Sequence, residues 1–362
     1  MKNLFSGLMI FSLLSLTLFV AGCSPEGTGG KGGSVSLQGA GASFPKPIYE
    51  KWMNEYGKVN NGVKIDYQSV GSGAGQNAII AGTADFGASD DPMKDEDLKK
   101  AKGDLLHIPT VLGAVVLTYN LKEVKEPLKL TSDTIAGIFL GEIKKWNDPR
   151  IAAENPGAEL PDTEISPVYR ADSSGTTAVF TDYLAKTSEK FKEKVGTGKQ
   201  PNWVQGVGVG AKGNDGVMGQ VKNTPNTIGY VEIAFAKENK LPMALIKNKA
   251  GKFVEPSLEN VSAAAEGSAG NMPEDLRMKI TNADGETAYP IASYTYILAF
   301  REQKDAVKGK ALADFLWWAL HDGSEFAKAL HYAPLPEAVL KKVEGKINSI
   351  SSGGKSLREG AE

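Results

Sequence analysis

The sequence contains little cysteine and little histidine, and it has no excess of charge of either sign. A single cysteine among 362 residues excludes an internal disulfide framework. His107, His321 and His331 are scattered without metal-ligand spacing, which argues against a zinc site. Lysine and arginine number 41 against 43 for aspartate and glutamate, whereas nucleic-acid binding needs a basic face. We therefore expect no metal, no cofactor and no nucleic-acid partner.

The composition that is present is typical of a folded protein. Hydrophobic residues make up 41% and charged residues 23%, so the chain is able to bury a sizeable core. A length of 362 residues is enough for two ordinary domains.

The N-terminus has the features of a cleaved signal peptide. Lys2 precedes an apolar run over 4–20, and the small residues Ala21 and Gly22 lead to Cys23. A membrane-spanning anchor is the alternative, but such a helix needs about 20 apolar residues. We predict a signal peptide over 1–22 and, because glycine and serine favour flexibility, a flexible linker over 23–33.

From Ser34 onward, short apolar strands alternate with amphipathic helices, which predicts an α/β fold. The periodicity predicts strands at 35–37, 63–70, 83–89, 108–120, 165–170, 228–233 and 289–300. It predicts helices starting near 46 and 72, and others over 132–140, 176–191, 311–320 and 336–346.

Two long apolar strands, at 108–120 and 289–300, bracket the middle of the chain. We predict that the chain crosses between two lobes at these strands, with lobe 1 formed by 34–120 plus 291–362 and lobe 2 by 121–290. Two crossing segments form a hinge, and hinged lobes can close around a ligand in the cleft between them.

Four short segments share a chemistry suited to an anion. They are Ser43-Phe44, Ser72-Gly73, Asp90 and the run 170–176 (RADSSGT). Three of them lie where a strand gives way to a helix, and helix N-termini present unpaired N–H groups to anions. Helix capping is the alternative for any single segment, because Ser, Thr and Asp are preferred caps. The combination favours a ligand, since an Arg in a Gly-Ser turn suits an oxyanion.

Seven motifs resemble the bacterial phosphate-binding proteins of the high-affinity phosphate ABC importer. They are GAGASFP, YQSVGSG, DFGASD, FLGEIKKWNDP, YRADSSGTT, KGNDGV and IGYVE, and the similarity extends over 37–336. The ending at Cys23 resembles the lipobox of bacterial lipoproteins, which implies a lipid anchor on this cysteine.

The resemblance implies a two-lobed periplasmic-binding-protein fold of type II, with one inorganic phosphate held in the cleft. It implies that Asp90 is the acceptor, that Arg170 is the cation and that Asp172 orients Arg170. The implied donors are Ser43, Phe44, Ser72, Ser174, Gly175 and Thr176. Ser43 stands where some relatives have threonine, and the hydroxyl is retained. The implied partners are a permease and ATPase complex and, through Cys23, a membrane; we expect a monomer.

The acceptor implies selectivity. A carboxylate facing an anion is costly unless a proton lies between them. Phosphate near neutral pH carries such a proton and sulfate does not, so we expect rejection of sulfate.

Two alternative functions remain at this point. A phosphatase or phosphotransferase would use Ser174 or Ser72 as the nucleophile, although no nearby base or metal pair is evident. A structural or adhesive lipoprotein would leave the cleft without a ligand. The G-x-G-x-x-G match at 208–213 lacks the preceding strand that a dinucleotide site requires.

Overall fold

The computed structural model describes residues 34–358. The predicted signal peptide, Cys23 and linker over 23–33 therefore lie outside the described residues. Within the described range, no helix is both long enough and apolar enough to cross a membrane.

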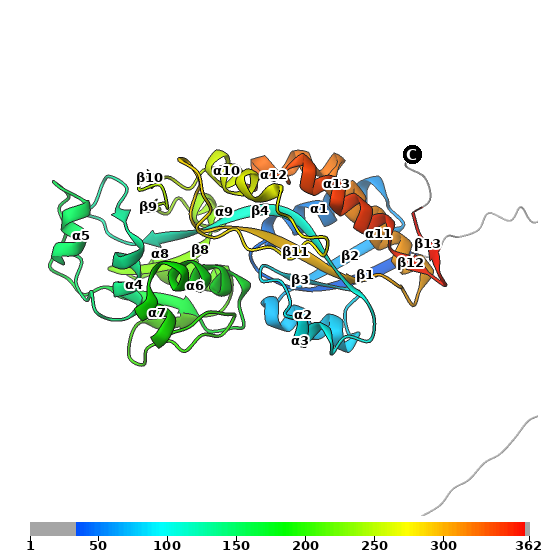
Figure 1. Cartoon of the computed structure of the whole chain (residues 1–362), viewed down its shortest axis with the longest axis horizontal. Coiled ribbons are helices and arrows are strands. Elements are labelled where there is room, and N and C mark those ends of the chain that lie inside the picture. Colours follow the sequence, from blue (N-terminus) through cyan, green and yellow to red (C-terminus); the bar gives the residue numbers. More distant parts are fainter. Residues whose placement is uncertain (1–33, 359–362) are drawn as a thin grey trace, which may run out of the picture. The chain divides into compact units, whose positions relative to one another are not determined.

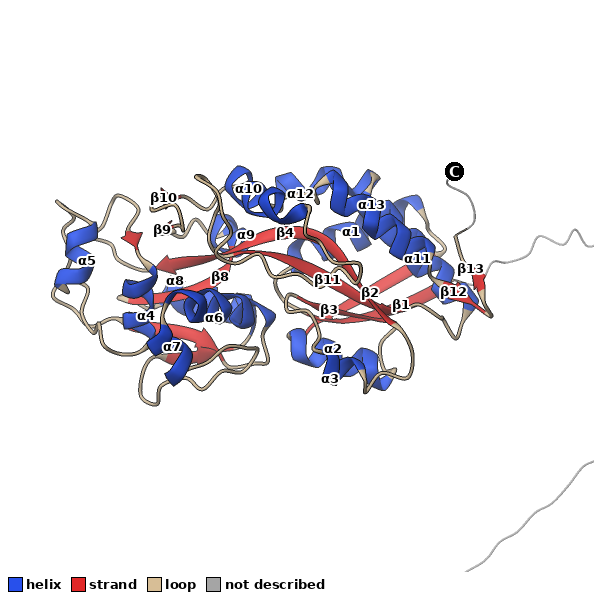
Figure 2. Ribbon diagram, viewed as in Figure 1, coloured by secondary structure: helices blue, strands red, loops and turns tan. Residues whose placement is uncertain are grey.

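A mixed sheet of eight strands runs through the described structure in the order β2-β1-β3-β11-β4-β8-β6-β7 (Figure 2). β1 pairs in parallel with β2 and β3, and β6 pairs in parallel with β7 and β8. The strands are β1 (Val35–Gly41), β2 (Val63–Ser69), β3 (Phe86–Ser89), β4 (Leu105–Tyr119), β6 (Ser166–Arg170), β7 (Val209–Ala211), β8 (Thr227–Glu232) and β11 (Ala292–Phe300).

β4 belongs to both halves of this sheet. It pairs with β11 from Leu105 to Ala114, and from Val115 to Tyr119 it pairs with β8. All of its residues are buried, as the continuous apolar sequence predicted for a strand covered on both faces. The predicted α/β layering is confirmed, and β4 is one of the strands on which the two lobes are built.

Helices cover both faces of the first half of the sheet. In Figure 1, α1, α11 and α13 lie on one side of the strands and α2 and α3 lie on the other. α1 begins directly after Pro45 and has Pro47 in its first turn, where proline is well tolerated. It buries Ile48, Tyr49, Trp52, Met53 and Tyr56 as predicted. The bounds are α1 (Lys46–Val59), α2 (Ser72–Ala81), α3 (Asp95–Leu98), α11 (Ala306–Leu320), α12 (Glu325–Ala329) and α13 (Glu337–Asn348).

The second half of the sheet carries the remaining helices and a small three-stranded sheet. Its helices are α4 (Ser132–Phe139), α5 (Pro149–Glu154), α6 (Gly175–Thr187), α7 (Glu189–Lys194), α8 (Gly213–Asn223), α9 (Ile233–Glu238) and α10 (Leu258–Ala269). The small sheet has the order β10-β9-β5, formed by β5 (Lys129–Leu130), β9 (Leu245–Lys247) and β10 (Phe253–Val254). A hairpin of β12 (Ser351–Ser352) and β13 (Lys355–Ser356) lies near the C-terminal end.

The prediction of one helix over 176–191 is wrong. Ser188 has extended backbone angles, and its hydroxyl accepts a hydrogen bond from the Phe191 N–H, so it ends α6 and caps α7. Serine is a strong N-cap because its side chain competes with the helix for backbone donors.

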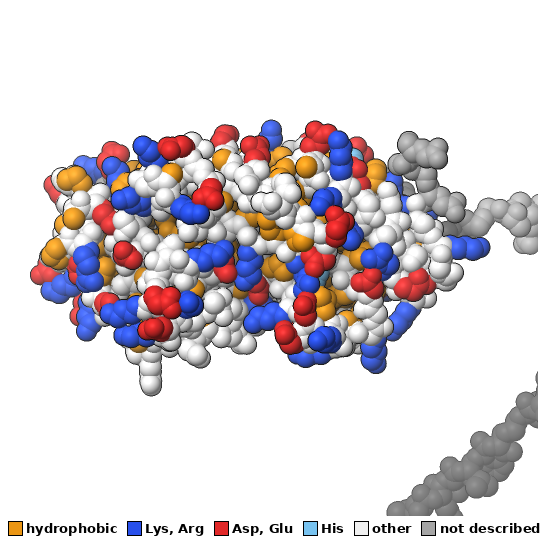
Figure 3. Space-filling view, viewed as in Figure 1, with side chains coloured by type: hydrophobic (Ala, Val, Ile, Leu, Met, Phe, Trp, Pro, Cys, Tyr) orange, Lys and Arg blue, Asp and Glu red, His pale blue; other side chains and the backbone are white. Residues whose placement is uncertain are grey.

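The G-x-G-x-x-G match at 208–213 does not have the geometry of a dinucleotide site. The short strand β7 lies inside the match, and 196–208 before it contains no strand. A phosphate-binding turn of that kind must follow the strand. On the face seen in Figure 3, charges of both signs are interspersed, in keeping with the balanced composition.

Candidate functional site

The predicted site residues lie at the ends of strands that share one sheet. Ser43 follows β1, Asp90 follows β3, and Arg170 is the last residue of β6. β1 and β3 are parallel neighbours, with Gly41 paired to Ala88, so their carboxyl ends meet at the same edge. Ser43, Ser72, Asp90, Arg170, Ser174 and Thr176 are all buried.

Asp90 is 2% exposed, and its carboxylate accepts hydrogen bonds from two threonines that lie far apart in the sequence. The Thr295 hydroxyl donates to Oδ1 at 2.9 Å, and the Thr176 hydroxyl donates to Oδ2 at 3.3 Å. Burial raises the pKa of Asp90 to about 7, against the opposing effects of Thr295 and Arg170. This carboxyl is therefore able to share a proton near neutral pH.

Arg170 is held by a two-pronged contact with Asp172. Its Nε donates to Oδ1 at 2.7 Å and its Nη2 to Oδ2 at 2.6 Å. Burial acts to raise the pKa of Asp172, but the hydrogen bond and charge of Arg170 hold that pKa below its usual value. The remaining nitrogen, Nη1, faces the Thr176 hydroxyl at 3.3 Å. Asp172 thus pairs with two nitrogens of the guanidinium and leaves Nη1 facing the start of α6.

Tyr230 fixes the backbone of Arg170 relative to α6. Its hydroxyl accepts a hydrogen bond from the Arg170 N–H at 3.0 Å and lies 2.6 Å from the hydroxyl of Thr177. The Tyr230 ring stacks on Phe180 with the ring centres 4.3 Å apart. The buried aromatic pair therefore couples the end of β6 to the first turns of α6.

The N-terminus of α6 reaches Asp90 because residue 175 has no side chain. A Cβ atom at Gly175 would lie 2.8 Å from both Asp90 N and Asp90 Oδ2 and would overlap the Ser72 hydroxyl. Ser174 caps the helix by accepting a hydrogen bond from the Thr177 N–H at 3.0 Å. Its single hydroxyl proton remains free to be donated.

Of the two remaining predicted residues, Ser72 contacts Asp90 and Phe44 directly follows Ser43 in the chain. The Ser72 hydroxyl accepts a hydrogen bond from the Asp90 N–H at 3.3 Å. The Phe44 ring is fully buried, and its carbonyl accepts from the Tyr332 hydroxyl at 2.7 Å.

Several residues that contact the predicted set were missed by the sequence reasoning, among them Thr295 and Asn214. Thr295 is a hydroxyl residue in the apolar strand β11, and this polar interruption of a buried strand was the available signal. Asn214 hydrogen-bonds to Ser43 and Thr176. It lies in the motif KGNDGV, but its isolated sequence position gave no indication of these partners.

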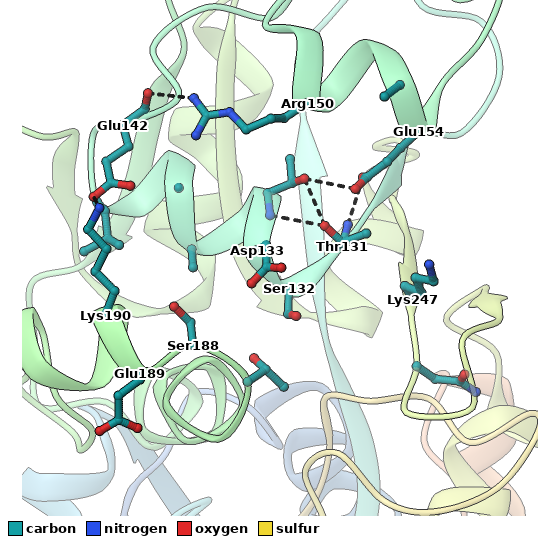
Figure 4. Close-up of a pocket in the computed structure, with 17 residues that line it drawn as sticks. Thr131, Ser132, Asp133, Glu142, Arg150, Glu154, Ser188, Glu189, Lys190 and Lys247 are labelled. Carbon is teal, nitrogen blue, oxygen red and sulfur yellow. Dashed lines mark hydrogen bonds and ion pairs between the residues drawn. The ribbon is translucent and has the colours of Figure 1, made fainter.

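A cavity of about 870 Å³ lies elsewhere, in the second half of the structure (Figure 4). None of the predicted residues lines it, and several of its polar side chains are already paired. Lys190 contacts Glu142 at 2.6 Å, and Glu154 accepts from the Thr131 N–H at 3.0 Å. A much smaller cavity, of about 10 Å³, adjoins Asp90.

The comparisons with known proteins agree on one family. The model of the PBP superfamily domain matches residues 26–322. The phosphate-binding protein PstS of Pasteurella multocida is 47% identical over 325 residues, which cover 89% of this chain and 93% of that protein. The phosphate-binding protein PstS of Methanocaldococcus jannaschii is 39% identical over 378 residues, covering 96% of each chain.

Solved structures of similar fold include two phosphate-binding proteins. A high-affinity periplasmic phosphate-binding protein (PfluDING) bound with phosphate has a TM-score of 0.70 and 22% identity, with 88% of this chain and 97% of that chain covered. The phosphate-binding protein of Stenotrophomonas maltophilia has a TM-score of 0.68 and 20% identity, with coverage of 86% and 94%. At these identities the structures establish the fold, which is the predicted two-lobed periplasmic-binding-protein fold.

Proposed function

The chain belongs to the PstS phosphate-binding proteins of the PBP superfamily, and from this premise we propose that it binds one inorganic phosphate between its lobes. The single observation that supports this most directly is the pairing of one oriented guanidinium, Arg170, with one buried acceptor, Asp90, through the hydroxyl of Thr176.

The groups proposed to contact phosphate come from both lobes as the sequence predicts them. Ser43, the Phe44 N–H, Ser72 and Asp90 belong to lobe 1, over 34–120 plus 291–362. Arg170, Ser174, the Gly175 N–H and Thr176 belong to lobe 2, over 121–290. A ligand favours the closed arrangement only if it gains contacts in that arrangement, and an anion bridging both sets does so.

The chemistry of Asp90 gives the site its selectivity. A phosphate proton satisfies the carboxylate, whereas sulfate would place oxygen lone pairs against it without a donor. Sites built around one specific hydrogen bond reject an analogue that lacks it by about 10⁴- to 10⁵-fold. Arsenate carries the same proton and is not distinguished by this argument.

We further propose that the protein works outside the cytoplasm and delivers phosphate to the permease and ATPase complex of an ABC transporter. A lipid on Cys23 would hold it at a membrane, with 23–33 as the tether, and it would act as a monomer. Mass spectrometry of the purified membrane form tests the anchor, since an unmodified Cys23 would contradict it. Size-exclusion chromatography with light scattering tests the monomer.

The protein catalyses nothing in this proposal. The relatives reported above are binding proteins by name, so the phosphatase alternative has no support from them. Purified protein should retain one phosphate per chain and should not turn over a chromogenic phosphate ester.

Calorimetric titration of anion-stripped protein tests the proposed function. We expect one phosphate per chain and no measurable heat from sulfate. Arg170→Ala should weaken phosphate binding by about 2 to 5 kcal/mol, because it removes a desolvated charge partner of the anion. Near wild-type affinity in this variant would remove Arg170 from the site, and absence of phosphate binding by the wild type would contradict the function.

A further inference from the structure

Asn214 joins groups from both lobes at the centre of the site. It is the second residue of α8, and its side chain is fully buried. Its Nδ2 donates to the Ser43 hydroxyl at 2.9 Å and to the Thr176 hydroxyl at 3.2 Å. Its backbone N–H also donates to the Ser43 hydroxyl, at 3.1 Å. Asn214 thus contacts one predicted phosphate donor from each lobe.

The orientation of the Asn214 amide is fixed by a group that can only donate. The backbone N–H of Glu232 lies 2.8 Å from Asn214 Oδ1. A backbone N–H cannot accept a hydrogen bond, so the oxygen of the amide must face it. The NH₂ group is consequently the part that faces Ser43 and Thr176.

This orientation determines where the Ser43 proton can go. A serine hydroxyl has two acceptor lone pairs and one proton. Both lone pairs of Ser43 are used by Asn214, one by its backbone N–H and one by Nδ2. The remaining hydrogen-bonding capacity of Ser43 is its proton, which must point away from these donors.

Thr176 is constrained in the same way. Its hydroxyl accepts from Asn214 Nδ2 at 3.2 Å and from Arg170 Nη1 at 3.3 Å. Its proton is therefore left to be donated, and in this structure it is donated to Asp90 Oδ2 at 3.3 Å. Ser43 and Thr176 both face the site as donors, and Asp90 faces it as an acceptor.

We infer that Asn214 is a positioning residue that sets the polarity of Ser43 and Thr176, so that both hydroxyls can act only as proton donors toward the bound anion. The inference rests on the proposed function and names a residue that specifies the chemistry of the same site. It follows that an acceptor in place of the NH₂ group at residue 214 should stop the Ser43 hydroxyl from donating to the anion, although the serine is still present.

Asn214→Asp reverses that character with little change in size. One carboxylate oxygen can still accept from Glu232, while the other replaces the NH₂ group and draws the Ser43 proton toward itself. The matched control is Asn223→Asp, which adds the same charge to the exposed end of the same helix. We expect phosphate affinity to fall at least 100-fold in Asn214→Asp and less than threefold in the control.

A double-mutant cycle with Ser43→Ala separates positioning from added charge. In the wild type, Ser43→Ala should weaken phosphate binding about tenfold, whereas in the Asn214→Asp background it should have less than a threefold effect, because the donor is already lost. Equal effects of Ser43→Ala in both backgrounds would overturn the inference, and they would leave the proposed function intact as long as the wild type binds phosphate.

Two further measurements keep the inference testable if Asn214→Asp fails to fold. Asn214→Leu removes the NH₂ donor without adding charge and frees one lone pair of Ser43, so a partly reduced effect of Ser43→Ala is expected in that background. Neutron diffraction from the wild-type phosphate complex locates the Ser43 deuteron directly. A deuteron directed at phosphate supports the inference, and one directed at Asn214 overturns it.

Discussion

Asp90 is a buried acid whose pKa lies far above that of an exposed aspartate. Burial raises its pKa to about 7 in the folded protein, whereas the pKa in an unfolded chain is about 3.9. Between these values the folded protein holds a proton that the unfolded chain has released. The contribution of Asp90 to stability is therefore complete below pH 4 and is lost as the pH rises toward 7.

This linkage predicts a pH-dependent difference between the wild type and Asp90→Asn, neither holding phosphate. The free energy of unfolding of the wild type should fall relative to the variant by about 2 to 4 kcal/mol between pH 4 and pH 7. Urea unfolding in phosphate-free buffers measures it. Parallel pH profiles for the two proteins would show that Asp90 does not titrate in this range.

The same substitution tests selectivity. Asn presents an NH₂ group that can donate to sulfate, so Asp90→Asn should reduce the preference for phosphate over sulfate by at least 100-fold. Competition titrations with phosphate and sulfate measure the ratio of the two affinities. An unchanged ratio would mean that the acceptor lies elsewhere.

The sequence was informative about polar residues at strand ends and helix starts and uninformative about the buried residues that reach them from distant elements. Ser43, Ser72, Asp90 and Arg170 follow strands or begin helices, and that local context is visible in the chain. Thr295 contacts Asp90 across 205 positions and Asn214 contacts Ser43 across 171 positions, and hydrogen bonds between such distant strands and helices leave no local pattern. Only the folded sheet brings them to Asp90 and Ser43.

At the scale of elements, the approach of α6 to the end of β3 depends on a missing side chain. Gly175→Ala would place a methyl group against the Asp90 backbone and carboxylate. We predict a 10- to 1,000-fold loss of phosphate affinity, because the first turn of α6 has to withdraw from Asp90. Calorimetric titration checks this.

Gly57→Ala in α1 is the matched control. A Cβ at Gly57 would meet no atom within 4 Å, so this variant should bind phosphate normally. It should also gain about 0.4 to 1 kcal/mol of stability, because alanine favours the helix. Similar affinities in the two variants would contradict the role given to Gly175.

Elements with strong periodicity were predictable, and their ends and the short elements were less so. The buried strand β4 and the helix α1 follow directly from apolar patterning. The break at Ser188 was missed because the apolar stripe continues across it into Phe191. The strands β5, β9 and β10 have two or three residues each, too few to establish a period.

At the scale of the whole molecule, charged groups link the two halves beside the site. Lys279 Nζ lies 3.1 Å from Asp91, which follows β3, and 3.5 Å from Asp182, on α6. Asp91 is buried, and the Lys199 ammonium is farther from it, at 3.8 Å. Lys279 is therefore the nearest of these cations to a carboxylate that adjoins Asp90.

Lys279→Met should weaken phosphate binding about 10- to 100-fold. The ion pair between Lys279 and Asp91 forms only when the two halves are together, so its loss destabilises the closed, phosphate-bound arrangement. Lys310→Met is the control, since Lys310 pairs with Asp314 within the exposed face of α11. Titration calorimetry on both variants checks the prediction. Equal affinities would indicate that Lys279 contributes nothing to bringing the halves together.

The strand β4 limits how such proteins can recombine. An exchange of 121–290 between two relatives would transplant a lobe whose partner strand for β8 is encoded upstream of the exchanged segment. The donor's β8 would have to pair with the recipient's β4 in the same register, and the side chains of the two strands would have to pack together. Lobes of this architecture are therefore not independent genetic modules, and a productive chimera has to inherit β4 together with β8.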